Sequence, residues 1–490
     1  MDSARLPDES TGQPLAMTEK ERPDVATVFS LATTNNGMDC HGETPRNDRT
    51  IVGVEMNQTL RIFLLTIVAL SFSGFAFAEP AWKASLSVGE EYNDNTDEEK
   101  NGRDDFVTTV RPSLSYAREG ERFLFQSAYS GDYRFYAKNT QDEEFNHNLN
   151  VHALLDAWED FFFLDLTDTY RLVNEDRTRG DTLRDNPSQE LDQDNPYTQG
   201  DLRQDNSQSL VQQNTFTFSP YITPRFGERG QAKIGYAYSN IWYDDSDKDS
   251  KDIHRGFVDT DYELTERAAL LSGYSYTQEL SEDDTLHRHI AYLGGRYAYA
   301  ETGSVFLKAG PQYTRYQERD TSATSLYWDA GLDHDFGAVQ LSLSSGITFD
   351  DDPDTGQTYE RRYGTLRLSK AWERTRASVF TTLEDYEENS GVDDVDSETG
   401  EDAESIRRTV LGLNISHELT ARLTGTLGLS HDFEDSDENT KRWYASLGLT
   451  YALSEKLSLG GWYRFKDSTS DDEDEEFRVN RVGVQLTYLF

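Results

Sequence analysis

The sequence of 490 residues is short of cysteine, of long apolar runs and of positive charge. Its single cysteine, Cys40, lies near the N-terminus, so the rest of the chain can form no disulfide, thiolate metal site or haem attachment of its own. A hydrophobic content of 36% and a mean hydropathy of −0.76 exclude a bundle of transmembrane helices. Ninety acidic residues against 47 basic ones give a formal net charge of −43, which makes nucleic acid a poor partner.

One window, residues 62–72, is continuously apolar, and its surroundings are typical of a secretory signal. Arg61 precedes the window, which runs into an Ala-Phe-Ala tripeptide ending at Ala78. A basic flank, a short apolar core and an Ala-x-Ala site predict cleavage between Ala78 and Glu79. A transmembrane anchor is the alternative interpretation, but an apolar run this short spans a bilayer poorly.

The position of the methionines divides the chain into three parts. Signal peptides begin close to a start methionine, and Met56 stands just before the apolar window. We therefore expect residues 56–78 to be the signal peptide and residues 1–55 to be an upstream over-extension of the reading frame, untranslated or removed. The mature chain, 79–490, would then contain no cysteine, which suits an oxidising periplasm.

From about Trp82 to Phe490, apolar and polar residues alternate in segments of ten to fourteen. In the segment 339–349, the apolar residues of one parity are Val339, Leu341, Leu343, Ile347 and Phe349. Because successive side chains of a strand point to opposite faces, each such segment predicts a strand with one oily and one wet face.

About twenty such strands are expected, with 18 to 22 as the range. We place them at 82–92, 106–116, 121–134, 145–156, 161–171, 208–221, 231–243, 253–264, 267–278, 287–299, 303–316, 323–335, 338–349, 358–370, 374–386, 404–418, 421–434, 440–453, 456–467 and 477–490. The connections alternate between short turns and longer acidic loops, as in outer-membrane barrels. The predicted fold class is all-β: a transmembrane antiparallel up-and-down β-barrel. A soluble propeller or solenoid is the alternative, but it gives no reason for long loops at every second connection.

This alternation also predicts how the barrel lies in the bacterial outer membrane. If the first strand rises from the periplasm, all the acidic loops lie outside the cell and both termini lie in the periplasm. The last strand carries Tyr488 and Phe490 on its apolar face, a pattern that resembles the signal read by the barrel-assembly machinery. Aromatic residues gather near the expected strand ends, which predicts two belts at the headgroup level. The expected partners there are outer-membrane lipid and lipopolysaccharide.

A barrel of this size is too wide for its side chains to fill, so its lumen holds water or a plug. The wet faces predict a polar lining rich in amides and cations: Lys83, Arg111, Gln126, Asn146, Asn148, Asn150, His152, Gln213, Thr215, Lys233, Arg296, Lys308, Gln312, Gln340, Arg464 and Lys466. Such a lining would admit sugars or small anionic solutes. The long loop 172–207 either folds inward and constricts the lumen or lies outside as a flap.

Other binding and catalytic signals are weak. Residues 387–404 hold nine acids without a Lys or Arg, and 471–476 are six acids in a row, which suits a solvated surface or loosely bound divalent cations. His287 and His289 share a strand face, but a metal pair without a third ligand is usually incidental. No catalytic motif is found, so we expect no enzyme, no cofactor and no dedicated metal site.

Two short stretches carry a resemblance to a known family. Residues 87–95, Ser-Val-Gly-Glu-Glu-Tyr-Asn-Asp-Asn, and residues 214–221, Asn-Thr-Phe-Thr-Phe-Ser-Pro-Tyr, resemble the opening strand and a mid-chain strand of a broad family of outer-membrane β-barrel porins. Some members of that family are associated with exosortase (PEP-CTERM) and exopolysaccharide systems. The resemblance implies export or diffusion of surface polysaccharide, and it names no catalytic or binding residue.

The first functional hypothesis is a monomeric barrel that acts as a passive conduit for exopolysaccharide or its fragments. The second is a surface protein whose acidic loops engage an extracellular ligand while the lumen stays blocked. The third is a sheath around a periplasmic lipoprotein or a multihaem cytochrome, in which any haem would belong to the partner because the mature chain has no cysteine.

Overall fold

The computed structural model describes residues 81–174, 210–245, 248–281, 284–318, 320–351, 358–388, 405–436, 439–471 and 476–490. The expected signal peptide, its cleavage between Ala78 and Glu79, and nearly all of the loop 172–207 lie outside the described residues. The described residues include no helix that is long and apolar enough to cross a membrane.

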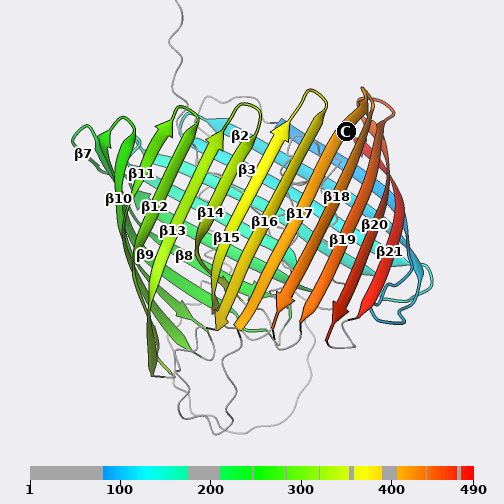
Figure 1. Ribbon diagram of the computed structural model, residues 1–490, viewed down its shortest axis with the longest axis horizontal. Helices are drawn as coiled ribbons and strands as arrows, with labels where there is room; N and C mark the ends of the chain where they lie inside the picture. The colour runs from blue at the N-terminus through cyan, green and yellow to red at the C-terminus, as the bar shows by residue number, and fades with distance from the viewer. Residues whose placement is uncertain are drawn as a thin grey trace, which may run out of the picture.

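The chain forms one antiparallel sheet that closes on itself (Figure 1). Its strands are β1 (Ala81–Asn93), β2 (Asp105–Gly120), β3 (Phe123–Tyr136), β4 (Glu144–Trp158), β5 (Phe162–Asn174), β6 (Leu210–Ile222), β7 (Arg225–Phe226), β8 (Gly230–Tyr243), β9 (Lys251–Thr265), β10 (Ala268–Leu280), β11 (Thr285–Ala300), β12 (Gly303–Tyr316), β13 (Thr321–Asp335), β14 (Gln340–Asp351), β15 (Thr358–Ala371), β16 (Thr375–Glu388), β17 (Ser405–Thr420), β18 (Leu423–Asp435), β19 (Thr440–Ala452), β20 (Leu457–Ser470) and β21 (Phe477–Leu489).

The first and last strands complete the barrel. β1 pairs with β21 from Ser85 opposite Leu489 to Asn93 opposite Arg481, and the Phe490 amide donates to the Ala84 carbonyl at 3.0 Å. The predicted twenty-stranded, all-β barrel is confirmed. Its one addition is the two-residue β7, which pairs with β8 inside the stretch expected to be a plain connection.

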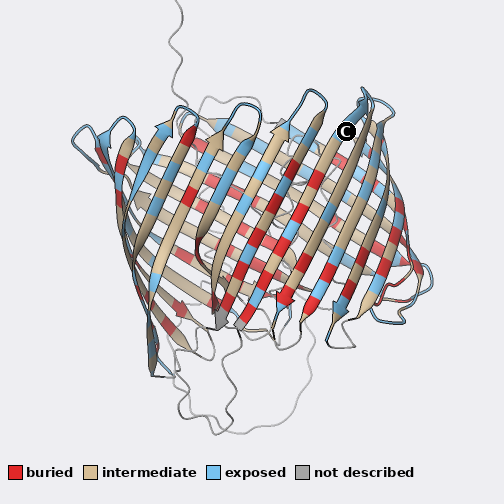
Figure 2. Ribbon diagram, in the orientation of Figure 1, coloured by how far each residue is buried: buried red, intermediate tan, exposed pale blue. Residues whose placement is uncertain are grey.

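Side-chain alternation explains why these segments form the wall. On β19, Trp443, Leu447 and Leu449 are exposed on the outer face, whereas Arg442 on the opposite face is buried. Figure 2 shows the same alternation of exposed and covered positions along most strands. A strand in a barrel meets lipid on one face only, so half of its residues can be polar.

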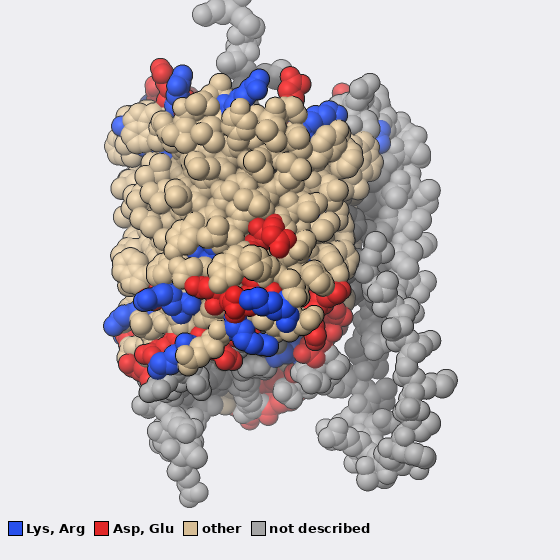
Figure 3. Space-filling view, turned by 90° about the vertical axis from the view of Figure 1, so that its right-hand side faces the viewer, with Lys and Arg blue, Asp and Glu red and all other residues tan. Residues whose placement is uncertain are grey.

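On the side of the barrel shown in Figure 3, a band with almost no charged residue lies between two charged rims. Many large apolar side chains are exposed on the outer strand faces, so we call this the apolar band. Exposed aromatic side chains mark both edges: Trp82, Trp158 and Trp372 near the rim with the short turns, and Phe106, Phe135 and Phe145 near the rim with the longer loops. Amphipathic and aromatic rings favour the headgroup level, which explains their places at these edges.

Some aromatic residues near the strand ends face the lumen and not the lipid. Trp462 lies on the lumen side, where the Arg464 guanidinium stacks 4.2 Å from its ring centroid. Tyr243 and Tyr444 also face inward, because each follows an outward-facing tryptophan and neighbouring side chains in a strand alternate. Aromatic pairs in sequence therefore supply only one ring each to the outer belts.

One stretch of wall departs from the sequence pattern. β13 and β14 pair only from Asp329–Gly346 to Asp335–Gln340, and beyond this the two strands diverge toward the loop rim (Figure 1). The ends of β14 and β15, residues 347–351 and 358–362, lie against the lumen side of β9 to β12, and we call them the arm. Phe349 was expected on the oily face; instead its ring stacks under the Arg288 guanidinium, 3.5 Å from the ring centroid, inside the barrel.

Candidate functional site in the lumen

The ten residues named as the main lumen lining all lie on the inner side of the wall by strand register. They are Lys83, Arg111, Gln126, Asn146, Asn148, Asn150, Lys233, Arg296, Lys308 and Gln340. They are spread over eight strands between β1 and β14, and none lies on β15 to β21, so they form part of a lining and no single site. Whether any of them contacts a solute stays a prediction.

Several of these inward cations have an acidic partner. Lys308 Nζ lies 2.7 Å from Asp329, Arg296 lies 3.0 Å from Asp261, and Arg111 lies 3.4 Å from Asp132. Lys233 Nζ instead stands 4.0 Å from the centroid of the Tyr221 ring. Each of the first three inward cations is therefore locally compensated by a carboxylate.

A row of ion pairs crosses the inner face from β14 to β19. Arg361 contacts Asp350 and Glu384, each at 2.6 Å, and Glu384 also accepts from Arg408 at 3.2 Å. Arg408 reaches Asp432 at 3.0 Å, and Arg442 continues the row to Glu434 at 2.8 Å. We call this set of seven side chains the ion-pair row.

Burial makes the ion-pair row costly to disturb. The side chains of Glu384, Arg408 and Asp432 are each only 1% exposed. Charges taken out of water are tolerated only when partners and hydrogen bonds compensate for the lost hydration. The row therefore fixes the relative register of β15 to β19 on the loop side of the lumen.

The connection between β1 and β2, residues 94–104, also enters the lumen. Its Glu98 carboxylate accepts from Lys466 on β20 at 2.8 Å and from Arg481 on β21 at 2.7 Å. Glu98 has a φ of 53°, an uncommon backbone conformation for a residue with a side chain. The two buried cations hold this turn of chain inside the rim.

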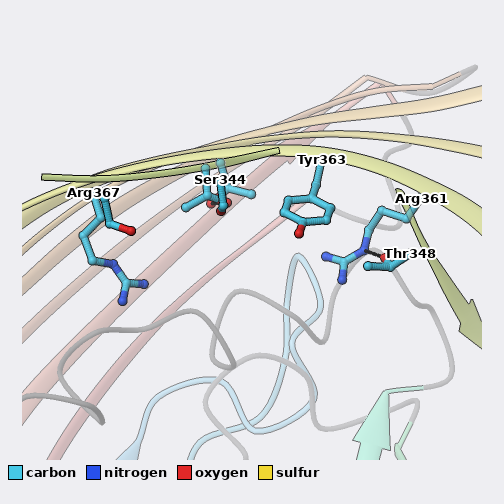
Figure 4. Close-up of a pocket in the computed structure, with 8 residues that line it drawn as sticks. Ser344, Thr348, Arg361, Tyr363 and Arg367 are labelled. Carbon is cyan, nitrogen blue, oxygen red and sulfur yellow. Dashed lines mark hydrogen bonds between the residues drawn. The ribbon is translucent and has the colours of Figure 1, made fainter. Parts of the chain in front are cut away.

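A cavity of about 350 Å³ opens on the inner face of β14 to β16 (Figure 4). It is lined by Ser342, Ser344, Thr348, Arg361, Tyr363, Thr365, Arg367 and Thr382. The five side chains labelled in Figure 4 hang from one face of the sheet into the lumen, and Arg361 Nε donates to the Thr348 hydroxyl at 3.3 Å. We call this cavity the hydroxyl pocket.

Strand register explains how these residue types meet. Ser342 lies opposite Arg367, Ser344 opposite Thr365, and Gly346 opposite Tyr363. A side chain at Gly346 would come within 3.1 Å of the Tyr363 hydroxyl, so the glycine leaves room for that ring. Hydroxyls, an aromatic face and guanidinium donors can together bind the hydroxyl and acidic groups of a sugar.

Sequence reasoning missed both the ion-pair row and the hydroxyl pocket. Their members have the lumen parity of their strands, but they come together only through the pairing of strands, which a single segment does not reveal. The available signal was charge complementarity: Glu384 lies directly opposite Arg408 once the β16–β17 hairpin is aligned. Alignment of the hairpins would have placed the two charges face to face.

The histidines considered for metal binding lie on the outer face. His287 Nδ1 is 2.8 Å from the Tyr276 hydroxyl, and His289 Nδ1 is 2.8 Å from the Tyr274 hydroxyl. In the part of the chain that the structure describes, no group of three His, Cys, Asp or Glu side chains is placed to hold a metal ion.

The fold and lumen define the class: this is a porin-like β-barrel of the outer membrane. The family model described as "Putative beta-barrel porin 2" matches residues 81–201 and 378–490, blocks that hold the opening and closing strands of the barrel. The chain belongs to this family. No curated protein matches its sequence.

Solved structures similar to this chain include transporters and porins. The FrpB iron transporter from Neisseria meningitidis (F3-3 variant) is 11% identical over 84% of this chain and 81% of its own, with a TM-score of 0.45. The siderophore receptor PirA from Pseudomonas aeruginosa is 11% identical over 84% and 80%, with a TM-score of 0.44. An anion-selective porin from Comamonas acidovorans is 13% identical over 84% and 100%, with a TM-score of 0.36.

The inward turn at residues 94–104 should loosen in acid. Arg103 donates two side-chain hydrogen bonds to the Asp97 carboxylate, at 2.7 and 2.8 Å, and these hold the pKa of Asp97 below its ordinary value of 3.8. A depressed carboxyl pKa contributes stability that is full above the ordinary value and is lost as pH falls through the folded pKa. An NMR titration should therefore show Asp97 ionised at pH 3.8 and the turn disordering at lower pH.

The Asp97→Asn variant is the control for this titration. Asparagine keeps the shape but cannot ionise, so its turn should show no acid step between neutral pH and the point where the wild-type turn opens. An acid step that persists unchanged in the variant would mean that another group controls the turn.

Proposed function

We propose that the protein is a passive conduit for polar solutes across the outer membrane, with sugars and sugar acids as the solute class. The observation that carries the proposal is the hydroxyl pocket, which places hydroxyls, a tyrosine ring and two arginines on the lumen wall. Porins exchange the hydration of a solute for polar groups of the wall, while lumen width sets the size limit. Fragments of an exopolysaccharide have this chemistry, which is why we include them in the solute class.

The structure also supports a rival function. The arm and the turn at 94–104 both reduce the open cross-section on the loop side, as a surface protein with a blocked lumen would require. In that case the loops would bind an extracellular ligand and no solute would pass. Genes for glycosyltransferases beside this gene would favour the conduit, and cytochrome genes would favour the sheath.

Solute flux into vesicles tests the conduit directly. Protein extracted from outer membranes and reconstituted should admit neutral monosaccharides and uronates, with flux falling as oligosaccharide length rises. The variant Arg367→Gln should slow uronates by roughly threefold or more while leaving neutral sugars nearly unchanged, because one charge-assisted hydrogen bond is lost.

The matched control is Arg407→Gln, which removes a charge from the outer face, where the side chain is 71% exposed. It should leave both fluxes unchanged. If the barrel is folded, as judged by heat-modifiable migration, and admits no sugar of any size, the conduit is wrong and the blocked-lumen function takes its place.

A further inference from the structure

The β14 half of the arm has the apolar alternation of a membrane wall, but the arm lies inside the lumen. Ile347 and Phe349 continue the apolar parity of Leu341 and Leu343, which are lipid-facing positions of β14. In the structure Ile347 is only 6% exposed, and the Phe349 ring is covered by Arg288. Residues of this type in this alternation are expected to meet lipid beside the next strand.

Four contacts hold the arm against the opposite wall, and we call them the latch. The Thr358 hydroxyl donates to Glu279 at 2.8 Å and accepts from Lys251 Nζ at 3.0 Å. Gln312 donates to Glu360 at 2.8 Å, and the Arg288 guanidinium covers the Phe349 ring. These partners belong to β9, β10, β11 and β12, so the latch joins the arm to strands that are not its neighbours in the sheet.

Some polar atoms of the latch lack hydrogen-bond partners among the described residues. Arg288 is buried, yet its Nε and Nη2 have no hydrogen-bond partner among the described residues, and neither does the Gln312 side-chain oxygen. A buried donor or acceptor without a partner costs free energy, because its hydration is lost and not replaced. A contact of this kind is suited to forming and breaking, since release returns these groups to water.

The part of β13 that precedes Asp329 could pair with the β14 half of the arm. The register of β13 and β14, in which Asp329 faces Gly346, would place Tyr327 opposite Thr348 and Leu326 opposite Phe349 if pairing continued. Phe349 and Ile347 would then face outward beside Leu326 and Trp328. Their β15 partners Glu360 and Arg362 would face outward as well, and their charges place this end of the wall at the loop rim, where a charge on the outer face costs little. The backbone edges of both strands would also be paired, as the hydrocarbon region of a bilayer demands.

We propose that the arm is a gate with two positions. In the latched position it crosses the loop side of the lumen; in the second position it pairs with β13, completes the wall and widens the passage. This inference rests on the proposed conduit function, and it assigns Arg288 and Glu360 to holding the gate closed.

Two double-cysteine variants test both positions in a Cys40→Ser background, where no other cysteine remains. Gln312→Cys with Glu360→Cys, joined by a cleavable bis-thiol cross-linker because the native side chains meet only at their ends, traps the latched arm. Tyr327→Cys with Thr348→Cys traps the arm against β13 as a disulfide. Cross-linking should lower single-channel conductance in the first variant and raise it by roughly twofold or more in the second, reversibly when the link is cleaved, because conduction follows open cross-section.

The control pair is Leu332→Cys with Leu343→Cys. These residues face each other where β13 and β14 are still paired, on the short-turn side of the point of divergence. It should cross-link without a change in conductance. Disulfide formation is also read independently, by the electrophoretic mobility of the folded barrel.

The outcomes separate the gate from the conduit. Failure of the Tyr327–Thr348 pair to cross-link in the folded barrel, or equal conductance in its oxidised and reduced forms, would overturn the gate while leaving the conduit intact. Cross-linking of both pairs without any conductance would support the movement and overturn the conduit.

Discussion

Replacing Arg408 by alanine should be the most destabilising single change to the barrel. Its guanidinium lies between Glu384 and Asp432, and all three side chains are 1% exposed. The variant leaves two buried carboxylates without their shared cation. Loss of one partner from a buried ion pair typically costs about 3–5 kcal/mol, so the free energy of unfolding should fall by that amount.

The measurement is urea-induced unfolding in lipid vesicles, and the next residue supplies the control. Arg407 lies on the outer face with its side chain 71% exposed, so Arg407→Ala should cost less than about 1 kcal/mol. Equal losses for the two variants would show that the ion-pair row does not hold this side of the barrel together.

The second large effect is expected from a cation placed on the lipid face. Leu447, in the middle of β19, is 52% exposed on the apolar band. An arginine at the bilayer midplane costs about 2–4 kcal/mol, so Leu447→Arg should unfold at lower urea concentration and insert poorly. The same measurement in vesicles reports both the midpoint and the inserted fraction.

Thr450→Arg is the matched control on the same strand. Thr450 has the opposite parity and lies between Thr424 and Gly460 on the lumen side, where water or polar groups can receive the charge. It should be tolerated to within about 1 kcal/mol. If the control proved the more damaging of the two, the assignment of inner and outer faces would be reversed.

Alternation alone was enough to predict the wall. On strands such as β4, the amides Asn146, Asn148 and Asn150 have one parity, and apolar residues have the other. A slip of one residue would exchange these faces, so the pattern specifies both the strand and its orientation. The strand count follows, because the alternation breaks off at each connection and begins again in the next strand.

Alternation failed where tertiary contacts overrode it. Phe349 has a lipid-facing parity, but the structure places it under Arg288, more than fifty residues earlier in the chain. The contacts of the ion-pair row could likewise not be predicted from one segment alone, because Glu384 and Arg408 meet only through the register of their hairpin. Contacts of this kind depend on long-range pairing that no single segment encodes.

Other predictions remain for experiment. Phe490 and Tyr488 lie on the outer face near the short-turn rim, their rings 5.1 Å apart, but recognition by the assembly machinery stays a prediction. The same holds for loosely bound divalent cations at the acidic loops, for lipopolysaccharide contacts and for a link to exopolysaccharide.

Single-channel recording in a planar bilayer is the decisive experiment for the conduit. We expect discrete, steady conductance steps from the folded barrel, with a smaller level when the arm is latched and a larger level when it pairs with β13. A barrel that is folded and heat-modifiable but passes no current, even with the arm cross-linked to β13, would contradict a water-filled conduit.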